Sequence, residues 1–262
     1  MRMFQVDAFA GELFHGNPAA VVPLEAWLPE GLMQQIAMEN NLAETAFFVP
    51  HGKGFLLRWF TPTVEVALCG HATLASTHVL FGHLGYGTNP VVFHTLQSGD
   101  LRAKRDGPNR YTLDFPETPA FQVDFAPLGV LFESLNVPAA PVLKGPFDYL
   151  VVLDSEKAVE ELQPDFKRLA TVPCRGVVVT APGDRSDFVS RCFFPQTGID
   201  EDPVTGSAHT MTVPYWAKRL GKSRLFAIQL SARRGYLECQ LLGDRVLMTG
   251  EARTFLQGEI LL

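Results

Sequence analysis

Short segments in which apolar and polar residues alternate recur along almost the whole chain. Glycines, prolines and asparagines separate these segments, and such alternation is typical of strands that bury one face. The segments predicted as strands are residues 3–9, 19–22, 45–49, 55–60, 91–95, 111–115, 149–153, 176–180, 188–194, 225–230 and 245–249. The pattern therefore predicts a protein dominated by β-sheet.

Three segments follow a helical pattern instead. Residues 29–39 begin with a proline, which the first turn of a helix tolerates. Residues 70–81 and 206–220 each begin with a glycine, are rich in small residues in their opening turns, and show no broad charged face. A helix without a charged face is usually buried, so we expect these two helices to lie inside a sheet.

The two small-residue helices are introduced by similar sequences. Residues 59–62 (WFTP) precede Gly70, and residues 193–196 (FFPQ) precede Gly206 about half a chain later. This spacing indicates an internal duplication, although chance similarity between loops rich in glycine and proline would produce the same pattern. The proline-bearing stretch 116–127 is the expected boundary between the two halves.

Composition restricts the class of ligand. The chain has 262 residues, 47% of them hydrophobic, and a net charge of −6, which exclude a disordered chain and disfavour nucleic acid or an anionic membrane as partner. No apolar stretch approaches the length of a membrane-spanning helix. Gln5, Asp7 and Glu12 interrupt the position where a signal peptide needs an apolar core. We expect a cytoplasmic protein that binds a small molecule.

Cysteine and histidine spacing does not predict a metal centre. The four cysteines are far apart and form no CxxC pair, so we expect free thiols. His71, His78 and His83 lie close together in sequence, but no HExxH or Cys/His ligand spacing accompanies them.

The first turns of the two small-residue helices are candidate anion-binding elements. Their N–H groups have no partner within the helix, and the helix dipole adds partial positive charge, so the two ends together could hold a carboxylate. His71 and Ser207 follow Gly70 and Gly206 and could donate further hydrogen bonds. The alternative is that the glycines only permit tight turns. Asp202 and its acidic neighbours could cap the second helix or orient a polar group of a ligand.

Glu44 stands at the entrance of an apolar predicted strand, after a polar turn. A half-buried carboxylate at this position could exchange a proton with carbon. The alternative is an ordinary surface glutamate at the edge of a strand.

Five sequence blocks then suggest a family. They are VDAF at 6–9 with GNPAAVV at 16–22, NLAETAF at 41–47, RWFTP at 58–62 with EV at 65–66 and CGHAT at 69–73, EDPVTGSA at 201–208, and TGEA at 249–252. Together, and in this order, they resemble the PhzF-like family of phenazine biosynthesis proteins over nearly the whole chain.

This resemblance implies an α+β fold like that of diaminopimelate epimerase, with two pseudo-symmetric halves that are each a mixed β-sheet or barrel around a central helix. The halves would be residues 1–116 plus 250–262 and residues 117–249, with the active site in the cleft between them. The resemblance also implies a homodimer that needs no cofactor.

The resemblance further assigns roles to residues. Glu44 takes the place of the catalytic acid/base, and His71, Asp202 and Ser207 take the places of substrate-binding residues. Asn17, in the Gly-Asn-Pro sequence at 16–18, is a weaker candidate for substrate contact, with turn formation as the alternative.

The residues before the helix glycines discriminate between mechanisms. Cofactor-free racemases that resemble this family use two thiols on opposite faces of the substrate carbon, whereas this chain has Cys69 and Thr205. A threonine hydroxyl is too weakly acidic to replace a thiol. We therefore expect a cofactor-independent isomerase in which Glu44 shuttles a proton on a small carboxylate-bearing molecule. The alternatives are a catalytically silent carboxylate-binding or interaction protein, and an epimerase of amino or hydroxy acids that uses Cys69 opposite Glu44.

Overall fold

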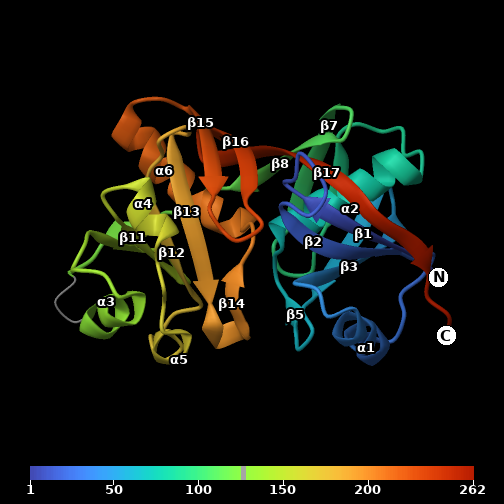
Figure 1. Ribbon diagram of the computed structural model, residues 1–262. Coiled ribbons are helices and arrows are strands. Elements are labelled where there is room, and N and C mark those ends of the chain that lie inside the picture. The colour runs from blue at the N-terminus through green and yellow to red at the C-terminus, as the bar shows by residue number, and fades with distance from the viewer. Residues whose placement is uncertain (125–127) are drawn as a thin grey trace. The chain divides into compact units, whose positions relative to one another are not determined.

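The computed structural model describes residues 1–124 and 128–262, so residues 125–127 of the expected boundary stretch, Pro127 included, lie outside the described residues (Figure 1). The chain forms two compact units. Unit 1 comprises Met1–Phe115 and Leu247–Leu262, and unit 2 comprises Pro116–Val246.

Unit 1 combines two helices with a set of strands. Its helices are α1 (Glu30–Asn40) and α2 (Gly70–His83), and its strands are β1 (Arg2–Ala8), β2 (Asn17–Pro23), β3 (Glu44–His51), β4 (Gly54–Phe60), β5 (Glu65–Val66), β6 (Val91–His94), β7 (Asp100–Gly107), β8 (Arg110–Pro116) and most of β17 (Arg245–Glu259). Helix α1 connects the parallel strands β2 and β3, and α2 connects the parallel strands β4 and β6. The C-terminal strand β17 returns to pair with β1.

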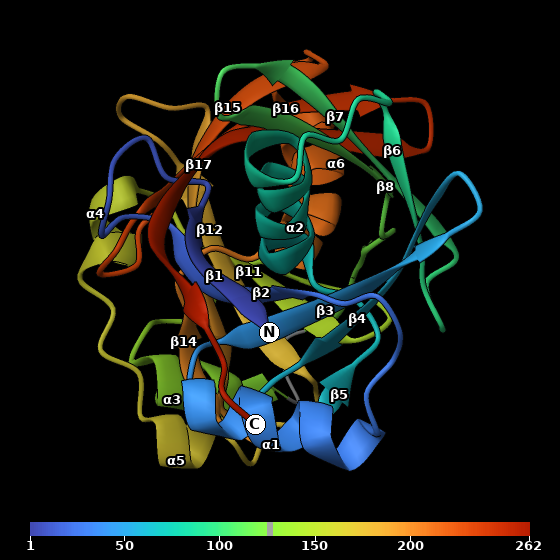
Figure 2. The same cartoon turned by 90° about the vertical axis from the view of Figure 1, so that its right-hand side faces the viewer.

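Helix α2 is the core of unit 1. Every residue from Gly70 to Phe81 is buried, as the missing charged face predicted. Figure 2 shows the helix surrounded by strands of unit 1, including β1, β2 and β7. The hydroxyl groups of Ser76 and Thr77 donate to the carbonyl oxygens four residues earlier, at 2.7 and 2.8 Å. Polar side chains can therefore be buried in this helix without losing their hydrogen bonds.

Unit 2 is built from the remaining elements. Its helices are α3 (Gly129–Leu135), α4 (Glu156–Glu160), α5 (Phe166–Leu169), the short η2 (Pro195–Thr197) and α6 (Gly206–Leu220), and its strands are β9 (Phe121–Gln122), β10 (Val142–Lys144), β11 (Asp148–Val152), β12 (Gly176–Pro182), β13 (Phe188–Phe194), β14 (Ile199–Asp202), β15 (Arg224–Gln229) and β16 (Gly235–Leu242). Helix α6 packs on β15 and β16, and its last turn is exposed.

The two units repeat one order of strand pairings. In unit 1, β2 pairs in parallel with β3, β3 and β4 are antiparallel, β4 and β5 are antiparallel, and β4 pairs in parallel with β6, which is antiparallel to β7. The corresponding elements of unit 2 are β11, β12, β13, β14, β15 and β16, with the same parallel and antiparallel pairings. Helices α2 and α6 occupy equivalent places. The internal duplication predicted from the sequence is confirmed.

Two further properties follow from the structure. The four cysteines are free thiols, as their spacing predicted. Among the described residues, no helix combines the length and the apolar character that crossing a membrane would require.

Candidate active site

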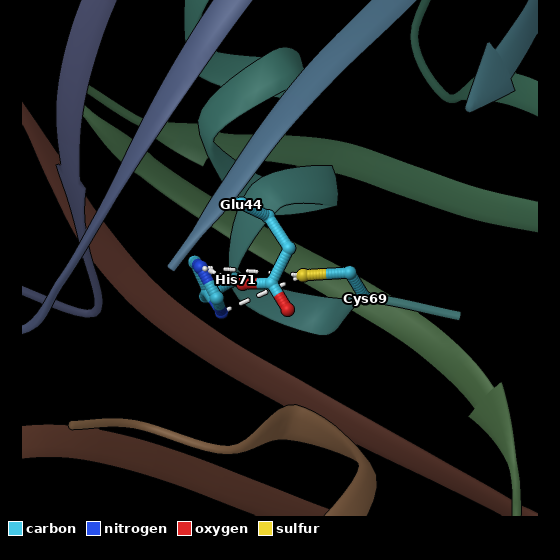
Figure 3. Close-up of side chains that lie close together, drawn as sticks. All are labelled: Glu44, Cys69 and His71. Carbon is cyan, nitrogen blue, oxygen red and sulfur yellow. Dashed lines mark hydrogen bonds and ion pairs between the residues drawn. The ribbon is translucent and has the colours of Figure 1, made fainter. Parts of the chain in front are cut away.

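Three side chains from separate parts of unit 1 point toward one another (Figure 3). Glu44 is the first residue of β3, Cys69 is the residue before α2, and His71 is the second residue of α2. The Oε2 atom of Glu44 lies 3.1 Å from Nε2 of His71, and the two side chains are only 12% and 3% exposed. The Sγ atom of Cys69 lies 3.6 Å from Nδ1 of His71. Glu44 is thus a largely buried carboxylate with a polar neighbourhood, and not a surface residue.

A fourth residue holds the histidine from its other side. Asn17 is the first residue of β2 and is fully buried, and its Nδ2 lies 3.0 Å from Nδ1 of His71. The suggestion that Asn17 serves only to form a turn is therefore wrong, because its backbone pairs within the sheet opposite Ala8.

Burial and charge perturb two of these groups. Burial and the nearby Glu44 carboxylate raise the pKa of the Cys69 thiol to about 11, so Cys69 retains its proton at neutral pH. For His71, burial lowers the pKa, but the sulfur of Cys69 and the carboxylate of Glu44 outweigh it and raise the pKa above its ordinary value. The cluster therefore holds a proton-bearing thiol beside a histidine and a carboxylate.

The start of α2 adds backbone N–H donors to this cluster. Cys69 has an extended backbone with φ of −140°, and its thiol interacts with the backbone of Ala72 in the first turn. The first N–H groups of a helix have no partner within the helix, so those of Gly70 and His71 are oriented toward the space in front of α2. This geometry suits an anionic oxygen.

In unit 2, the equivalent region is the loop between β14 and α6. Thr205 donates its hydroxyl hydrogen to Oδ2 of Asp202 at 2.6 Å, and Gln229 donates from Nε2 to the carbonyl of Asp202 at 2.7 Å. The N-cap residue of α6 is Thr205, whose own side chain makes no capping hydrogen bond. The neighbour of Asp202, Glu201, is paired with Arg191 at 2.7 Å. Side chains of unit 2 thus hold both Asp202 and Glu201.

Ser207, the second residue of α6, has a neighbour that the sequence did not reveal. Nη2 of Arg175 lies 3.4 Å from the hydroxyl oxygen of Ser207, and the same guanidinium makes two hydrogen bonds to the buried carboxylate of Asp148. The guanidinium also lies over the rings of Phe147 and Phe194. Arg175 is 36% exposed. The sequence does carry a signal for Arg175, because this single arginine directly precedes the apolar segment 176–180.

The two units therefore place different chemistry near the starts of corresponding strands. Glu44 begins β3 and contacts His71 at the start of α2. Arg175 directly precedes β12, the counterpart of β3, and contacts Ser207 at the start of α6. An acidic group in one unit corresponds to a cationic group in the other.

Glu44, Cys69 and His71 also have the spacing of a metal-ligand set, since their ligand atoms lie within 4.8 Å of one another. Sequence spacing did not show this set because Glu44 comes from a different strand. A metal bound here would need the Cys69 sulfur as a thiolate, so binding would have to release the proton that burial and the Glu44 carboxylate hold on this sulfur in the metal-free cluster. Proton transfer is the chemistry that these side chains suit better.

Comparison with known proteins gives consistent results. Residues 6–258 match the family model described as "Phenazine biosynthesis-like protein". An "uncharacterized isomerase" of Pseudomonas aeruginosa is 52% identical over 260 residues, which cover 99% of this chain and 98% of that protein. The crystal structure of a phenazine biosynthesis protein of the PhzF family from Enterococcus faecalis superposes with a TM-score of 0.94 and 45% identity, covering 100% of this chain and 99% of the other.

More distant structures share the fold alone. A probable proline racemase from Agrobacterium radiobacter matches with a TM-score of 0.65 at 12% identity, covering 100% of this chain and 93% of that protein. The α+β fold of the diaminopimelate epimerase type, with a repeated unit around a central helix, is thereby confirmed.

Proposed function

Because this chain belongs to the phenazine biosynthesis-like protein family, we propose that it is a cofactor-independent isomerase that moves one proton on a small carboxylate-bearing substrate. Glu44 is the acid/base. Its carboxylate removes a proton from a substrate carbon, the electron pair of that C–H bond shifts into the neighbouring unsaturated system, and Glu44 returns the proton to a second carbon on the same face. No oxidant or other reactant is needed for this step.

The observation that supports this role is the contact between Glu44 and His71. A carboxylate that is 12% exposed and 3.1 Å from a buried imidazole is oriented and shielded from water. Such a group suits proton transfer to and from carbon. The N–H groups of Gly70 and His71, which have no partner within the helix, would stabilise negative charge that develops on a substrate oxygen.

The remaining predicted residues are proposed to bind the substrate. Asp202 is the last residue of β14 and is held by Thr205, and Ser207 is the second residue of α6 and contacts Arg175. The N–H groups at Gly206 and Ser207 would hold a carboxylate or another anionic group. These assignments predict that substitutions of Asp202 or Ser207 raise KM more than they lower kcat.

Two observations argue against the epimerase alternative. Opposed acid and base groups need the substrate carbon between them, which separates them by about 6–7 Å when each reacting distance is ~3–3.5 Å. Cys69 and Glu44 present atoms within 4.8 Å of one another. The thiol also keeps its proton at neutral pH, since burial and Glu44 raise its pKa to about 11. Cys69 could therefore act as the acid but is poorly suited to the base role that the reverse direction requires.

The experiment is NMR in deuterated water with a panel of cyclic and acyclic carboxylic acids, including a dihydro-hydroxyanthranilate. We compare the wild-type protein with Glu44→Gln and with Glu39→Gln, a matched change at an exposed glutamate of α1. Double-bond migration or deuterium exchange that is lost only in Glu44→Gln supports the proposal. Saturable binding of a panel acid that is equal in all three proteins, without turnover, would instead indicate a silent binding protein.

A further inference from the structure

The amide group of Asn17 determines which atom is the donor in its hydrogen bond with His71. Its Nδ2 atom lies 3.0 Å from Nδ1 of His71. An amide nitrogen carries two hydrogens and accepts no hydrogen bond. The ring nitrogen that faces it must therefore accept, which requires that Nδ1 carries no hydrogen.

The hydrogen of a neutral His71 then resides on Nε2. This is the nitrogen that lies 3.1 Å from Oε2 of Glu44. We propose that Asn17 is a positioning residue that holds His71 as the Nε2–H tautomer, so that the Nε2–H group faces the Glu44 carboxylate 3.1 Å away and orients it electrostatically. This inference rests on the proposed role of Glu44 as the acid/base.

The arrangement protects the basicity of Glu44. An imidazolium at 3.1 Å would form an ion pair with the carboxylate in a poorly solvated site, and a carboxylate stabilised in this way is a weaker proton acceptor. A neutral imidazole with its hydrogen on Nε2 orients the carboxylate without adding a full positive charge. The Cys69 sulfur and the Glu44 carboxylate favour a second hydrogen on His71, since they raise its pKa. Asn17 opposes this addition by donating to Nδ1.

The burial of Asn17 separates this role from substrate binding. The side chain is fully buried, and its contact with the cluster is to His71, which in turn contacts Glu44. A histidine whose second nitrogen is held by a buried partner has a defined tautomer and ring orientation. Asn17 therefore acts on the acid/base through another residue, without touching the reacting atoms.

The proposal is tested by NMR of protein labelled with ¹⁵N-histidine at neutral pH, with the His71 signals assigned by their loss in His71→Gln. We expect a hydrogen on Nε2 of His71 and none on Nδ1. Asn17→Asp is nearly isosteric but presents only acceptors, so we expect a hydrogen to appear on Nδ1. Asn17→Leu removes the donor and should also release Nδ1. A hydrogen on Nδ1 in the wild-type protein would overturn the proposal.

A matched control is available in Asn40, whose Nδ2 donates to the hydroxyl of Thr45 at 3.1 Å. Asn40→Asp adds the same charge close to Glu44 without touching His71, so the His71 spectrum should not change. If Asn17→Leu fails to fold, the wild-type spectrum and Asn17→Asp still decide the question. An unchanged His71 spectrum in folded Asn17→Asp would contradict the proposal.

Kinetics then connect the tautomer to catalysis. With the panel acid that the wild-type protein turns over, Asn17→Asp should lower kcat about tenfold or more, a fraction of the ~10²–10⁴ that a positioned acid/base supplies, with little change in KM. A raised KM with unchanged kcat would indicate a substrate contact and contradict the positioning role. If the tautomer is as stated but Glu44→Gln keeps full activity, the proposed function fails and the tautomer assignment stands.

Discussion

Cys69 and Thr205 occupy equivalent positions, each directly before the central helix of its unit, and each has an extended backbone whose side chain does not cap the helix. Cys69 lies beside His71, whereas Thr205 donates to Asp202. The pair of thiols that a two-base racemase requires is therefore absent at these two positions.

Replacing Cys69 with serine should leave most of the activity intact. The thiol keeps its proton at neutral pH because burial, followed by the charge of Glu44, raises its pKa to about 11, so no thiolate base is lost. We expect less than a tenfold change, which corresponds to under about 1.4 kcal/mol in barrier height. Deuterium incorporation into the substrate in deuterated water measures it. Complete loss of exchange, with inversion at the α-carbon in the wild-type protein, would favour the epimerase mechanism instead.

Gln229 should be important for the stability of unit 2. Its side chain is fully buried, accepts from the backbone N–H of Thr205 at 2.8 Å and donates to the carbonyl of Asp202 at 2.7 Å. Gln229→Leu removes both of these buried hydrogen bonds, and a buried backbone group left unsatisfied costs about 1–3 kcal/mol. Urea unfolding should show this loss, and Gln257→Leu at an exposed site of β17 should not. Equal stability of the two variants would contradict the assignment.

Removing one partner of the Arg175–Asp148 ion pair should destabilise the protein more than replacing both partners with apolar residues. Asp148 is buried and is held by two hydrogen bonds from Arg175. Arg175→Met leaves an uncompensated buried carboxylate, for which the expected loss is about 2–3 kcal/mol, at the low end because Arg175 is partly exposed. Adding Asp148→Leu should recover much of this loss. Urea unfolding of the single and double variants provides the measurement, and additive losses would contradict it.

Two buried histidines should make the folded state sensitive to acid. Burial, together with the nearby charges of His83, Arg253 and Arg105, lowers the pKa of His78 to about 4. Burial also lowers the pKa of His209 to about 4. Unfolded histidines bind protons below about pH 6.5, whereas these two stay neutral in the folded state. Stability should therefore be complete above pH 6.5 and decrease as the pH falls toward 4.

The expected loss is at most about 2 kcal/mol for each histidine between pH 6.5 and 5. His78 hydrogen-bonds to Tyr111 and Thr254, at 3.1 and 2.8 Å, so His78→Gln removes the titrating group and keeps a polar side chain. Urea unfolding from pH 7 to pH 5 should show a shallower decrease for this variant. Parallel curves for the variant and the wild-type protein would show that His78 does not contribute.

Strong local patterns made most of the fold predictable. Helix α6 begins and ends where the sequence predicted, because Gly206 and Gly221 bound it, the latter with a left-handed φ of 66°. Helix α2 was predicted to end at Phe81 but continues to His83. Strand β7 was missed because its polar residues, from Asp100 onward, face solvent and leave few apolar positions. The short helices α3, α4 and α5 have at most two turns and carry little periodic signal.

The candidate site was less predictable because its contacts are long-range. Neighbouring residues in sequence suggested Glu44 and His71 separately, but only the parallel pairing of β2 with β3 brings Asn17 and Glu44 to the same end of the sheet. The position of Arg175 depends in the same way on Asp148, which lies on the neighbouring strand β11. Hydrophobic periodicity carries no information about such partners.

The repeated order of strand pairings also has an evolutionary consequence. A duplicated ancestor with identical halves would have carried one chemical group twice, and a change in it would have altered both copies. When two halves of one chain diverge, each can carry a different group, and here Glu44 begins β3 whereas Arg175 directly precedes β12. A duplicated scaffold can thus specialise half by half, while the pairing of β2 with β3 and of β11 with β12 keeps the repeat visible in the structure.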